Sequence, residues 1–181
     1  MTSKRLGRQT VRLGSPVSVL SYANIGGKQE AQGPLAGYFD ELNQDAYFGQ
    51  KSWEKGESAM QQFALRRAME KGGLIPEDLD YVLAGDLLNQ CIGTSFSLRD
   101  FKIPFYGLYG ACSTMGESLS LAALLIDGGF ASIVAAMTSS HFCTAERQYR
   151  MPVLYGNQRT PTALSLIHIS EPTRLGMISY A

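Results

Sequence analysis

The sequence predicts an α/β fold in which short buried strands alternate with helices. Two apolar runs, Tyr81–Ala84 and Ala131–Met137, have the length of strands buried on both faces. A helical spacing of apolar residues covers Ser52–Lys71, and a second helix is expected over Ser113–Asp127. Strands that alternate with helices are typical of layered α/β proteins with a central sheet.

The first part of the chain is expected to form two strands, a loop and a helix. Thr10–Ala23 holds two apolar runs around a turn that contains Pro16. Gly26–Gly37 is a glycine-rich loop. A helix is expected over Ser52–Lys71, and the glycines Gly72–Gly73 that follow end its helical pattern. The apolar residues that share one face of this helix are Met60, Phe63, Ala64 and Ala68.

The second part is expected to alternate strand, strand, helix and strand. Tyr81–Ala84 is followed by a short apolar strand over Ile103–Tyr109. The helix Ser113–Asp127 is apolar almost all round from Leu119 to Ile126, which predicts a buried central helix. Ala131–Met137 then forms a further buried strand.

Composition and charge exclude several classes of protein. Lys and Arg number 16, Asp and Glu number 16, and the pI is about 6.7, which argues against a nucleic-acid-binding protein. A hydrophobic content of 45% is ordinary for one globular domain. The N-terminus has no apolar signal core, and Asp127 interrupts the longest apolar stretch, Leu119–Met137, so neither a signal peptide nor a membrane span is predicted.

The cysteines indicate a reducing, intracellular compartment. Cys91, Cys112 and Cys143 have neither the spacing of metal ligands nor a disulfide pattern. We therefore expect no metal site and no cofactor.

The segment Leu164–Ala181 reads as translated library DNA. LSLIHISEPTR is the translation of a common transposase sequencing adapter, and an index followed by further adapter bases accounts for the remaining residues. We expect residues 1–163 to be the truncated front of a longer protein and residues 164–181 to be no domain. The alternative is a natural amphipathic tail. A truncated chain is expected to leave apolar faces exposed.

The strongest candidate site is Gly110-Ala111-Cys112-Ser113-Thr114, where a strand turns into the buried helix. A thiol at a helix N-terminus lies beside unpaired N–H groups and the positive end of the helix dipole, which favour a nucleophilic thiolate. The same amides can hold a carboxylate. The alternative is that Cys112 is a small buried residue, and the spacing alone favours neither.

The loop after Tyr81–Ala84 is a second candidate, because ligands in α/β sheets bind beyond the carboxyl ends of strands. Asp86, Asn89 and Gln90 could supply polar contacts there. For Asp86 we favour helix capping and turn hydrogen bonds over ligand contact.

The loop after Ala131–Met137 contains Ser140 and His141. His141 is the only histidine before Leu164, so it is the only ordinary candidate for a base near neutral pH. A lone histidine is more often structural, and we favour that interpretation. The following Glu146–Arg150 is expected to be a solvated or interface face, with an anion contact as the less favoured alternative.

Blocks of sequence in these regions run in order through most of residues 1–163. They read AGDLLNQ at 84–90, IPFYGLYGACST at 103–114, ESLSLAALLIDGGFA at 117–131 and TSSHFCTAERQYRMPVLYGNQRTPTA at 138–163. With GGKQEAQGPLAGYFD at 26–40, they resemble the stage V sporulation protein AD family of spore-forming Firmicutes. The usual GACSTSME of that family is GACSTMGE here, and its SSHNA is SSHFC, which changes the surroundings of His141.

The resemblance implies a thiolase-like fold of two similar α/β halves, each with a mixed five-stranded sheet, around central buried helices. This chain would supply the first, N-terminal half. In active thiolase-like proteins the cysteine at the position of Cys112 carries the acyl group, and its partner residues come from the second half.

The resemblance also implies a role in sporulation. The family is associated with binding of dipicolinic acid, here as the free acid or a calcium chelate, and with its uptake into the forespore together with membrane-embedded SpoVA proteins. A forespore location peripheral to the spore inner membrane, and a homodimer, are expected on the same ground. The residues expected to contact the ligand are Cys112, Ser113, Thr114, Asn89, Ser140 and His141.

Two other functions stay open. An acyltransferase or condensing enzyme would use Cys112 as its acyl-carrying nucleophile, and the fold alone does not separate this from binding. A scaffold that contacts membrane partners is the third interpretation. We favour a binding protein without turnover.

Overall fold

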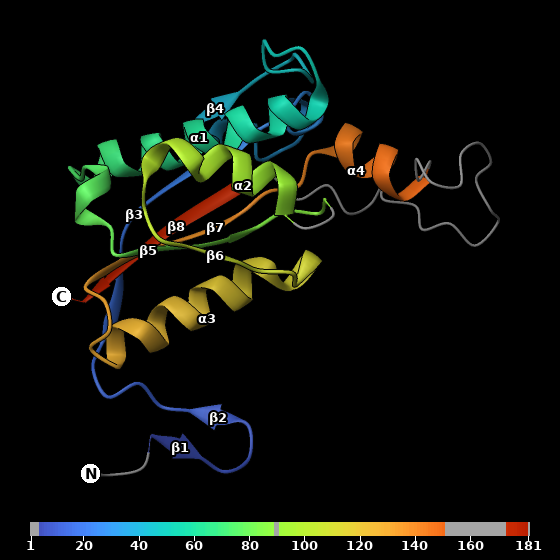
Figure 1. Ribbon diagram of the computed structural model, residues 1–181. Coiled ribbons are helices and arrows are strands. Elements are labelled where there is room, and N and C mark those ends of the chain that lie inside the picture. Colours follow the sequence, from blue (N-terminus) through green and yellow to red (C-terminus); the bar gives the residue numbers. More distant parts are fainter. Residues whose placement is uncertain (1–3, 89–90, 151–172, 181) are drawn as a thin grey trace.

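A mixed six-stranded sheet forms the centre of the computed structural model, which describes residues 4–88, 91–150 and 173–180 (Figure 1). The strands lie in the order β4-β3-β8-β7-β5-β6. β8 is antiparallel to both β3 and β7, and the other neighbouring pairs are parallel. Their bounds are β3 Val17–Gly26, β4 Glu41–Leu42, β5 Tyr81–Gly85, β6 Phe105–Gly107, β7 Ile133–Thr138 and β8 Thr173–Tyr180.

Helices cover both faces of this sheet. Figure 1 shows α1 and α2 on one face and α3 on the other, with α4 at the end of the sheet. The bounds are α1 Trp53–Gly72, α2 Ile92–Leu98, α3 Thr114–Asp127 and α4 Phe142–Arg150. A short hairpin of β1 (Arg5–Leu6) and β2 (Thr10–Val11) lies apart from the sheet. Five 3₁₀ turns lie at Glu30–Gln32, Ala36–Tyr38, Pro76–Asp78, Arg99–Phe101 and Ala111–Ser113.

The predicted α/β alternation is confirmed, and most ends of elements differ by one or two residues. The hydroxyl of Ser52 caps α1 by accepting the Lys55 N–H at 3.3 Å, and Gly73 ends the helix with a left-handed φ of 66°. The strand expected over Ile103–Tyr109 is shorter, since Pro104 has no N–H with which to extend the ladder.

Residues of adjacent strands alternate between two apolar cores. Val82 and Met137 pack against α1 on one face, together with Leu65. Leu83 and Val134 pack against α3 on the other face. This alternation is the two-residue period of strands that are buried on both sides.

The expectation that α3 is buried all round is wrong for the described chain. Ala122 and Ile126 are buried against the sheet, but Leu121 and Leu124 are 37% and 44% exposed. Only one layer of this chain packs on α3, so its opposite face has no apolar cover among the described residues (Figure 1). Phe130, just beyond the helix, is also exposed.

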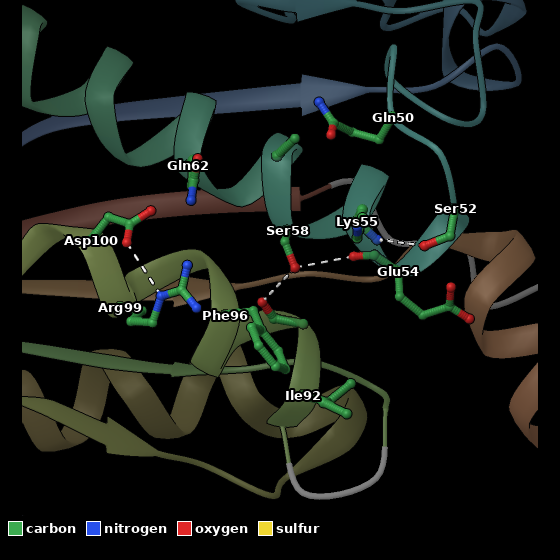
Figure 2. Close-up of a pocket in the computed structure, with 12 residues that line it drawn as sticks. Gln50, Ser52, Glu54, Lys55, Ser58, Gln62, Ile92, Phe96, Arg99 and Asp100 are labelled. Carbon is green, nitrogen blue, oxygen red and sulfur yellow. Dashed lines mark hydrogen bonds and ion pairs between the residues drawn. The ribbon is translucent and has the colours of Figure 1, made fainter.

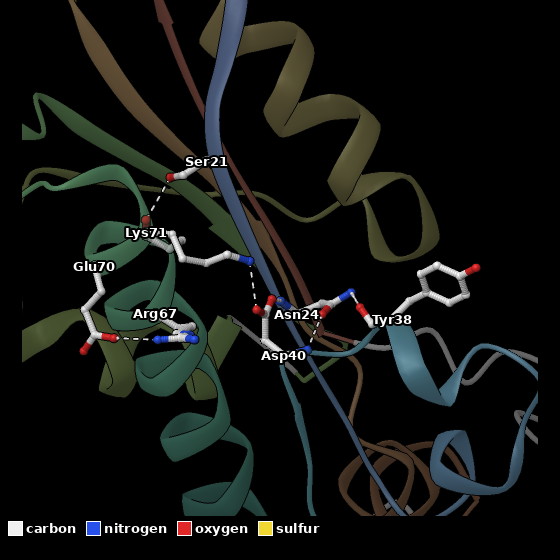
Figure 3. Close-up of polar contacts among 8 residues, drawn as sticks. Ser21, Asn24, Tyr38, Asp40, Arg67, Glu70 and Lys71 are labelled. Carbon is white, nitrogen blue, oxygen red and sulfur yellow. Dashed lines mark hydrogen bonds and ion pairs between the residues drawn. The ribbon is translucent and has the colours of Figure 1, made fainter.

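Polar contacts attach α1 to β3 and to the loop after it (Figure 3). Ser21 on β3 donates to the carbonyl of Ala68 at 2.8 Å. Lys71 forms an ion pair of 2.8 Å with Asp40, which also accepts the N–H of Asn24. These contacts fix the position of α1, the helix that carries Glu57.

β8 joins the two halves of the sheet. It supplies the pairing that connects β3 to β7, because those strands have no direct register with each other. It belongs to Leu164–Ala181, which the sequence attributes to a translated adapter. The pairing shows that a strand is needed between β3 and β7; the origin of the strand that fills the position stays a prediction.

Within the described ranges, none of the helices combines the length and the apolar character needed to cross a membrane.

A chain that ends at Ala163 is expected to lose cooperative unfolding. Without β8, the edges of β3 and β7 expose unpaired N–H and C=O groups, which favours aggregation. Size-exclusion chromatography and thermal unfolding of the shortened and the 181-residue chains would measure this. A soluble, monomeric 1–163 with a sharp transition would contradict it.

Candidate ligand site at the carboxyl ends of β5 and β7

Cys112 lies in the 3₁₀ turn Ala111–Ser113, directly before α3. Its side chain is exposed, which contradicts the alternative of a buried core cysteine. Ala111 has a left-handed φ of 48°, a conformation that an L-residue adopts only under local constraint. The structure therefore presents the thiol at the helix N-terminus, as the sequence predicts.

Thr114, the first residue of α3, is fully buried, and its Oγ1 has no hydrogen-bond partner among the described residues. A buried hydroxyl without a partner is unfavourable by about 1–3 kcal/mol, so such groups usually indicate a missing partner. Ser113 differs, since its hydroxyl donates to the carbonyl of Gly110 at 2.8 Å. The Ser113 hydroxyl is therefore hydrogen-bonded, whereas the Thr114 hydroxyl has no partner among the described residues.

Gly85, at the end of β5, makes room for this turn. A Cβ atom at Gly85 would lie 2.1 Å from the carbonyl oxygen of Leu108 and 3.1 Å from Cγ2 of Thr114. Since these are contacts closer than atoms tolerate, only glycine lets β5 and α3 approach in this way.

Asp86 acts as a turn and helix cap, which confirms the favoured interpretation. Its Oδ1 accepts the N–H of Leu88 at 2.8 Å, and its Oδ2 accepts the N–H of Thr94 in α2 at 2.7 Å. The hydroxyl of Thr94 donates to the same Oδ2. Asn89 and Gln90 lie outside the described residues, so the ligand role of Asn89 stays a prediction.

His141 occupies a structural position at the start of α4. Its Nε2 lies 2.8 Å from the carbonyl oxygen of Ala46, and its Nδ1 accepts the N–H of Thr144 at 3.4 Å. Burial lowers the pKa of His141, although the hydrogen bond to Ala46 acts in the opposite direction. Both ring nitrogens are engaged, as the favoured structural interpretation expects. Ser140 beside it is half-buried, and ligand contact by either residue stays a prediction.

The carboxyl group of Glu57 is the polar centre of this region. Glu57 comes from α1 and is only 1% exposed. Ser139 donates to its Oε1 at 2.7 Å, and Thr144 of α4 donates to its Oε2 at 2.6 Å. Glu57 therefore ties α1 to both ends of the segment Ser139–Thr144.

Burial raises the pKa of Glu57 to about 7, and the negative charge of Asp86 acts in the same direction. The hydrogen bonds from Thr144 and Ser139 favour the ionised form and oppose this rise. Glu57 thus changes its charge near neutral pH.

The network continues from Glu57 to the loop after β5. Gln61 donates its amide to Ser139 and accepts from Ser97 of α2 at 2.8 Å. Ser97 and Thr94 belong to the same helix, and Thr94 reaches Asp86. In addition, the N–H of Ser139 donates to the carbonyl of Gly85 at 3.1 Å. The two strand-end loops are therefore connected through buried polar groups.

Glu57 and Gln61 are not predicted as site residues from the sequence, although their position in the helix indicates a buried polar role. Both lie on the apolar stripe of α1, three or four residues before Met60, Ala64 and Leu65. A polar residue on the buried stripe of a helix indicates a hydrogen-bonded polar core, because an unpaired one would destabilise the fold.

Arg147 of α4 makes an ion pair rather than an anion site. Its guanidinium lies 2.6 Å from Glu54 and 5.3 Å from the centre of the Trp53 ring. This joins α4 to the start of α1 at the surface, consistent with the interface role expected for this segment.

A groove of about 480 Å³ lies between α1 and α2, away from the predicted site (Figure 2). Ser58 closes its base by donating to the carbonyl of Gly93 at 2.9 Å. Phe96 and Arg99 line its outer side. None of Cys112, Thr114 or His141 lines this groove.

The fold and the exposed cysteine before a central helix define a thiolase-like protein. The structure is similar to a priming beta-ketosynthase of a polyketide pathway, with a TM-score of 0.57 at 14% identity, covering 92% of this chain and 51% of that one. It is also similar to a tetronic acid condensing enzyme, with a TM-score of 0.56 at 18% identity, covering 92% and 55%. For 3-oxoacyl-[acyl-carrier-protein] synthase III from Aquifex aeolicus the TM-score is 0.51 at 16% identity, covering 68% and 38%.

Within this class, the chain belongs to the stage V sporulation protein AD (SpoVAD) family, whose sequence model matches residues 7–170. It is 43% identical over 164 residues to Stage V sporulation protein AD of Bacillus subtilis (strain 168), covering 91% of this chain. The chain spans 48% of the length of that relative. The resemblance predicted from the sequence blocks, and the thiolase-like fold, are therefore confirmed.

Replacing Glu57 with Gln should remove a pH dependence of stability. Because the folded-state pKa is raised from 4.5 to about 7, the folded chain holds a proton that the unfolded chain releases. The free energy of unfolding should thus fall as pH rises from 4.5 to about 7 and then level off, by at most roughly 3 kcal/mol. Urea unfolding at several pH values measures it.

The difference between wild type and Glu57→Gln isolates this carboxyl, because the lowered pKa of His141 gives the opposite slope in both proteins. Glu70→Gln, at an exposed carboxyl of the same helix, is the matched control. Equal pH profiles for wild type and Glu57→Gln would contradict a raised pKa of Glu57 in the folded state.

Replacing Gly85 with Ala should destabilise the fold by about 1–3 kcal/mol, because the new methyl group overlaps the carbonyl of Leu108. Gly116→Ala is the control, since a Cβ there meets no atom within 4 Å and helix propensity improves. Denaturant unfolding of both variants measures the effect, and an equally stable Gly85→Ala protein would contradict the close approach.

Proposed function

We propose that this chain is part of a sporulation protein that binds dipicolinic acid and supports its uptake into the forespore with membrane-embedded SpoVA proteins. The sporulation family and the thiolase-like fold are shown; the ligand, the uptake and the SpoVA partners are the proposal. The observation that carries it is the start of α3, where Cys112 is exposed and the buried Thr114 hydroxyl has no partner among the described residues.

The chemistry of the α3 N-terminus suits a dicarboxylate. The N–H groups of Ser113 and Thr114 donate to the carbonyls of Gly110 and Ala111, so the feature of this helix end that favours a negative ligand is the helix dipole, which also acts on Glu117 in the first turn. α3 runs over Thr114–Asp127, long enough for this effect. Dipicolinate carries two carboxylates at neutral pH, since carboxyl groups ionise near pH 4. The Thr114 hydroxyl would add one donor, and Ser140, Asn89 and the second half of the protein would complete the pocket.

Acyl transfer is the second candidate function, favoured by the exposed Cys112 and by the similarity to condensing enzymes. It requires a base close to the thiol. The one histidine of residues 4–88 and 91–150, His141, is buried and hydrogen-bonded through both nitrogens. His141 is thus held as a structural residue, and a base for Cys112 would come from the second half, where thiolase-like proteins carry the partners of this cysteine.

A homodimer and a position at the inner spore membrane belong to the same proposal. β6 is an edge strand of the sheet, and Tyr106 on it is half exposed. An uncovered edge of this kind can pair with a second copy. The exposed apolar side of α3, with Leu121 and Leu124, is where we expect the second α/β half to pack.

Titration of the full-length protein with dipicolinate tests the proposal. Cys112→Ala and Thr114→Val are expected to weaken binding about tenfold, the loss of one hydrogen bond to a charged ligand. Ser120→Ala removes an exposed hydroxyl from the same helix and should leave affinity unchanged. Unchanged affinity in Cys112→Ala, Thr114→Val and His141→Ala together would overturn the proposed site.

The rival function has its own readout. Incubation with acyl-CoA followed by mass spectrometry should show no adduct on Cys112 if the protein only binds. A stable acyl-cysteine together with no dipicolinate affinity would favour the condensing enzyme.

A further inference from the structure

We propose that Glu57 is a positioning residue whose protonated form holds the segment Ser139–Thr144 in place and thereby couples the candidate ligand site to proton uptake. The proposal rests on the buried hydrogen bonds of Glu57. Its predicted effect on dipicolinate affinity rests in addition on the proposed function. Glu57 itself lies behind the site residues, in the interior between α1 and α4.

Glu57 holds both ends of the segment Ser139–Thr144, which is also attached through the Ser139 N–H on the Gly85 carbonyl and the His141 ring on the Ala46 carbonyl. Ser139 and Thr144 are both nearly fully buried, and each spends a hydroxyl on Glu57. Ser140 and His141, two predicted ligand residues, lie between them. The hydrogen bonds of one carboxyl group therefore hold both ends of the stretch that carries these two residues.

A proton on Glu57 reverses the direction of its hydrogen bond with Thr144. Thr144 Oγ1 lies 2.6 Å from Glu57 Oε2 and 2.8 Å from the carbonyl oxygen of His141, but it has one proton to give. If Glu57 is protonated, its O–H donates to Thr144, and the Thr144 proton goes to the His141 carbonyl. If Glu57 is ionised, the Thr144 hydroxyl donates to the carboxylate. The carbonyl of His141 then loses its hydrogen bond from Thr144.

The ionised form of Glu57 accepts hydrogen bonds from Ser139, Thr144 and the His141 backbone, but its charge is buried without a cation beside it. Burial raises the pKa of Glu57 to about 7, and no cation is among the causes that act on it. The nearest ionisable neighbours are Asp86 after β5, which repels a second charge, and His141, which burial keeps neutral. Further charged or titratable groups on the packed elements include the Glu54–Arg147 pair that joins α1 and α4, Lys55 on α1, Cys143 on α4, and Asp45 and Tyr47 in the loop against Gly56.

The effect reaches the second candidate loop through Gln61. Its amide donates to Ser139 and its oxygen accepts from Ser97, and α2 in turn holds Asp86. A displaced Ser139 leaves the Gln61 amide without its partner in a buried site. Ionisation of Glu57 should thus loosen the loops after both β7 and β5.

Hydrogen exchange on the 181-residue chain tests the coupling without any ligand. After correction for the intrinsic exchange rate, opening of residues 139–145 should increase roughly tenfold from pH 6 to pH 8 in the wild type. Glu57→Gln keeps a donor and an acceptor and mimics the protonated form, so its opening should not change with pH. Glu70→Gln removes an exposed carboxyl from the same helix, so it is the matched surface control and should behave as the wild type.

Thr144→Val and Thr144→Ser give a second readout. Valine removes a hydrogen bond that favours the ionised carboxylate, so the midpoint of the pH profile should move upward; serine keeps the hydroxyl and should leave it unchanged. A merely structural role of Thr144 would change the opening at all pH values equally. The same profile in wild type and Glu57→Gln, or an unmoved midpoint in Thr144→Val, would overturn the proposal.

The effect on ligand binding is measured with dipicolinate and the full-length protein. The ligand stays doubly ionised from pH 6 to pH 8, so its own titration does not contribute. Affinity should fall up to about tenfold over this range in the wild type and stay constant in Glu57→Gln. If dipicolinate fails to bind at either pH, the proposed function fails, while the exchange experiment still decides the role of Glu57.

Discussion

A carboxyl group with 1% exposure must be surrounded by donors, and this requirement at Glu57 organises one end of the molecule. The partners of Glu57 come from the turn after β7 and from α4, and Gln61 carries the same network to α2. Segments far apart in the sequence are thereby brought to the carboxyl ends of two neighbouring parallel strands, β5 and β7. These ends are where α/β sheets usually bind ligands. The buried polar network is therefore the support on which the candidate site is built.

The other constraint is the sheet itself. Among the described residues, β8 alone connects β3 to β7, and only one side of α3 is covered. Both features agree with a thiolase-like half that spans 48% of its Bacillus subtilis relative. The exposed apolar side of α3 is where we expect further residues to pack, and Cys112 is exposed just before this helix.

Local patterns in the sequence predict much of this structure. The runs at Tyr81–Gly85 and Ile133–Thr138 are recognisable because strands buried on both faces are continuously apolar. The glycines after α1, and the turn before α3 that carries Cys112, are recognisable for similar local reasons. Three features are not local. α2 has a weak helical sequence and depends on the Asp86 cap; the exposed side of α3 depends on what packs there; and the role of Glu57 depends on Ser139 and Thr144, which are more than eighty residues away in sequence.

The most direct test of the central claim is a crystal structure of the full-length protein with dipicolinate bound. The account predicts density for the ligand at the start of α3, with a carboxylate beside Cys112 and within hydrogen-bond distance of the Thr114 hydroxyl. Ligand density in the groove between α1 and α2 instead, beside Phe96 and Arg99, with the α3 N-terminus empty, would contradict it.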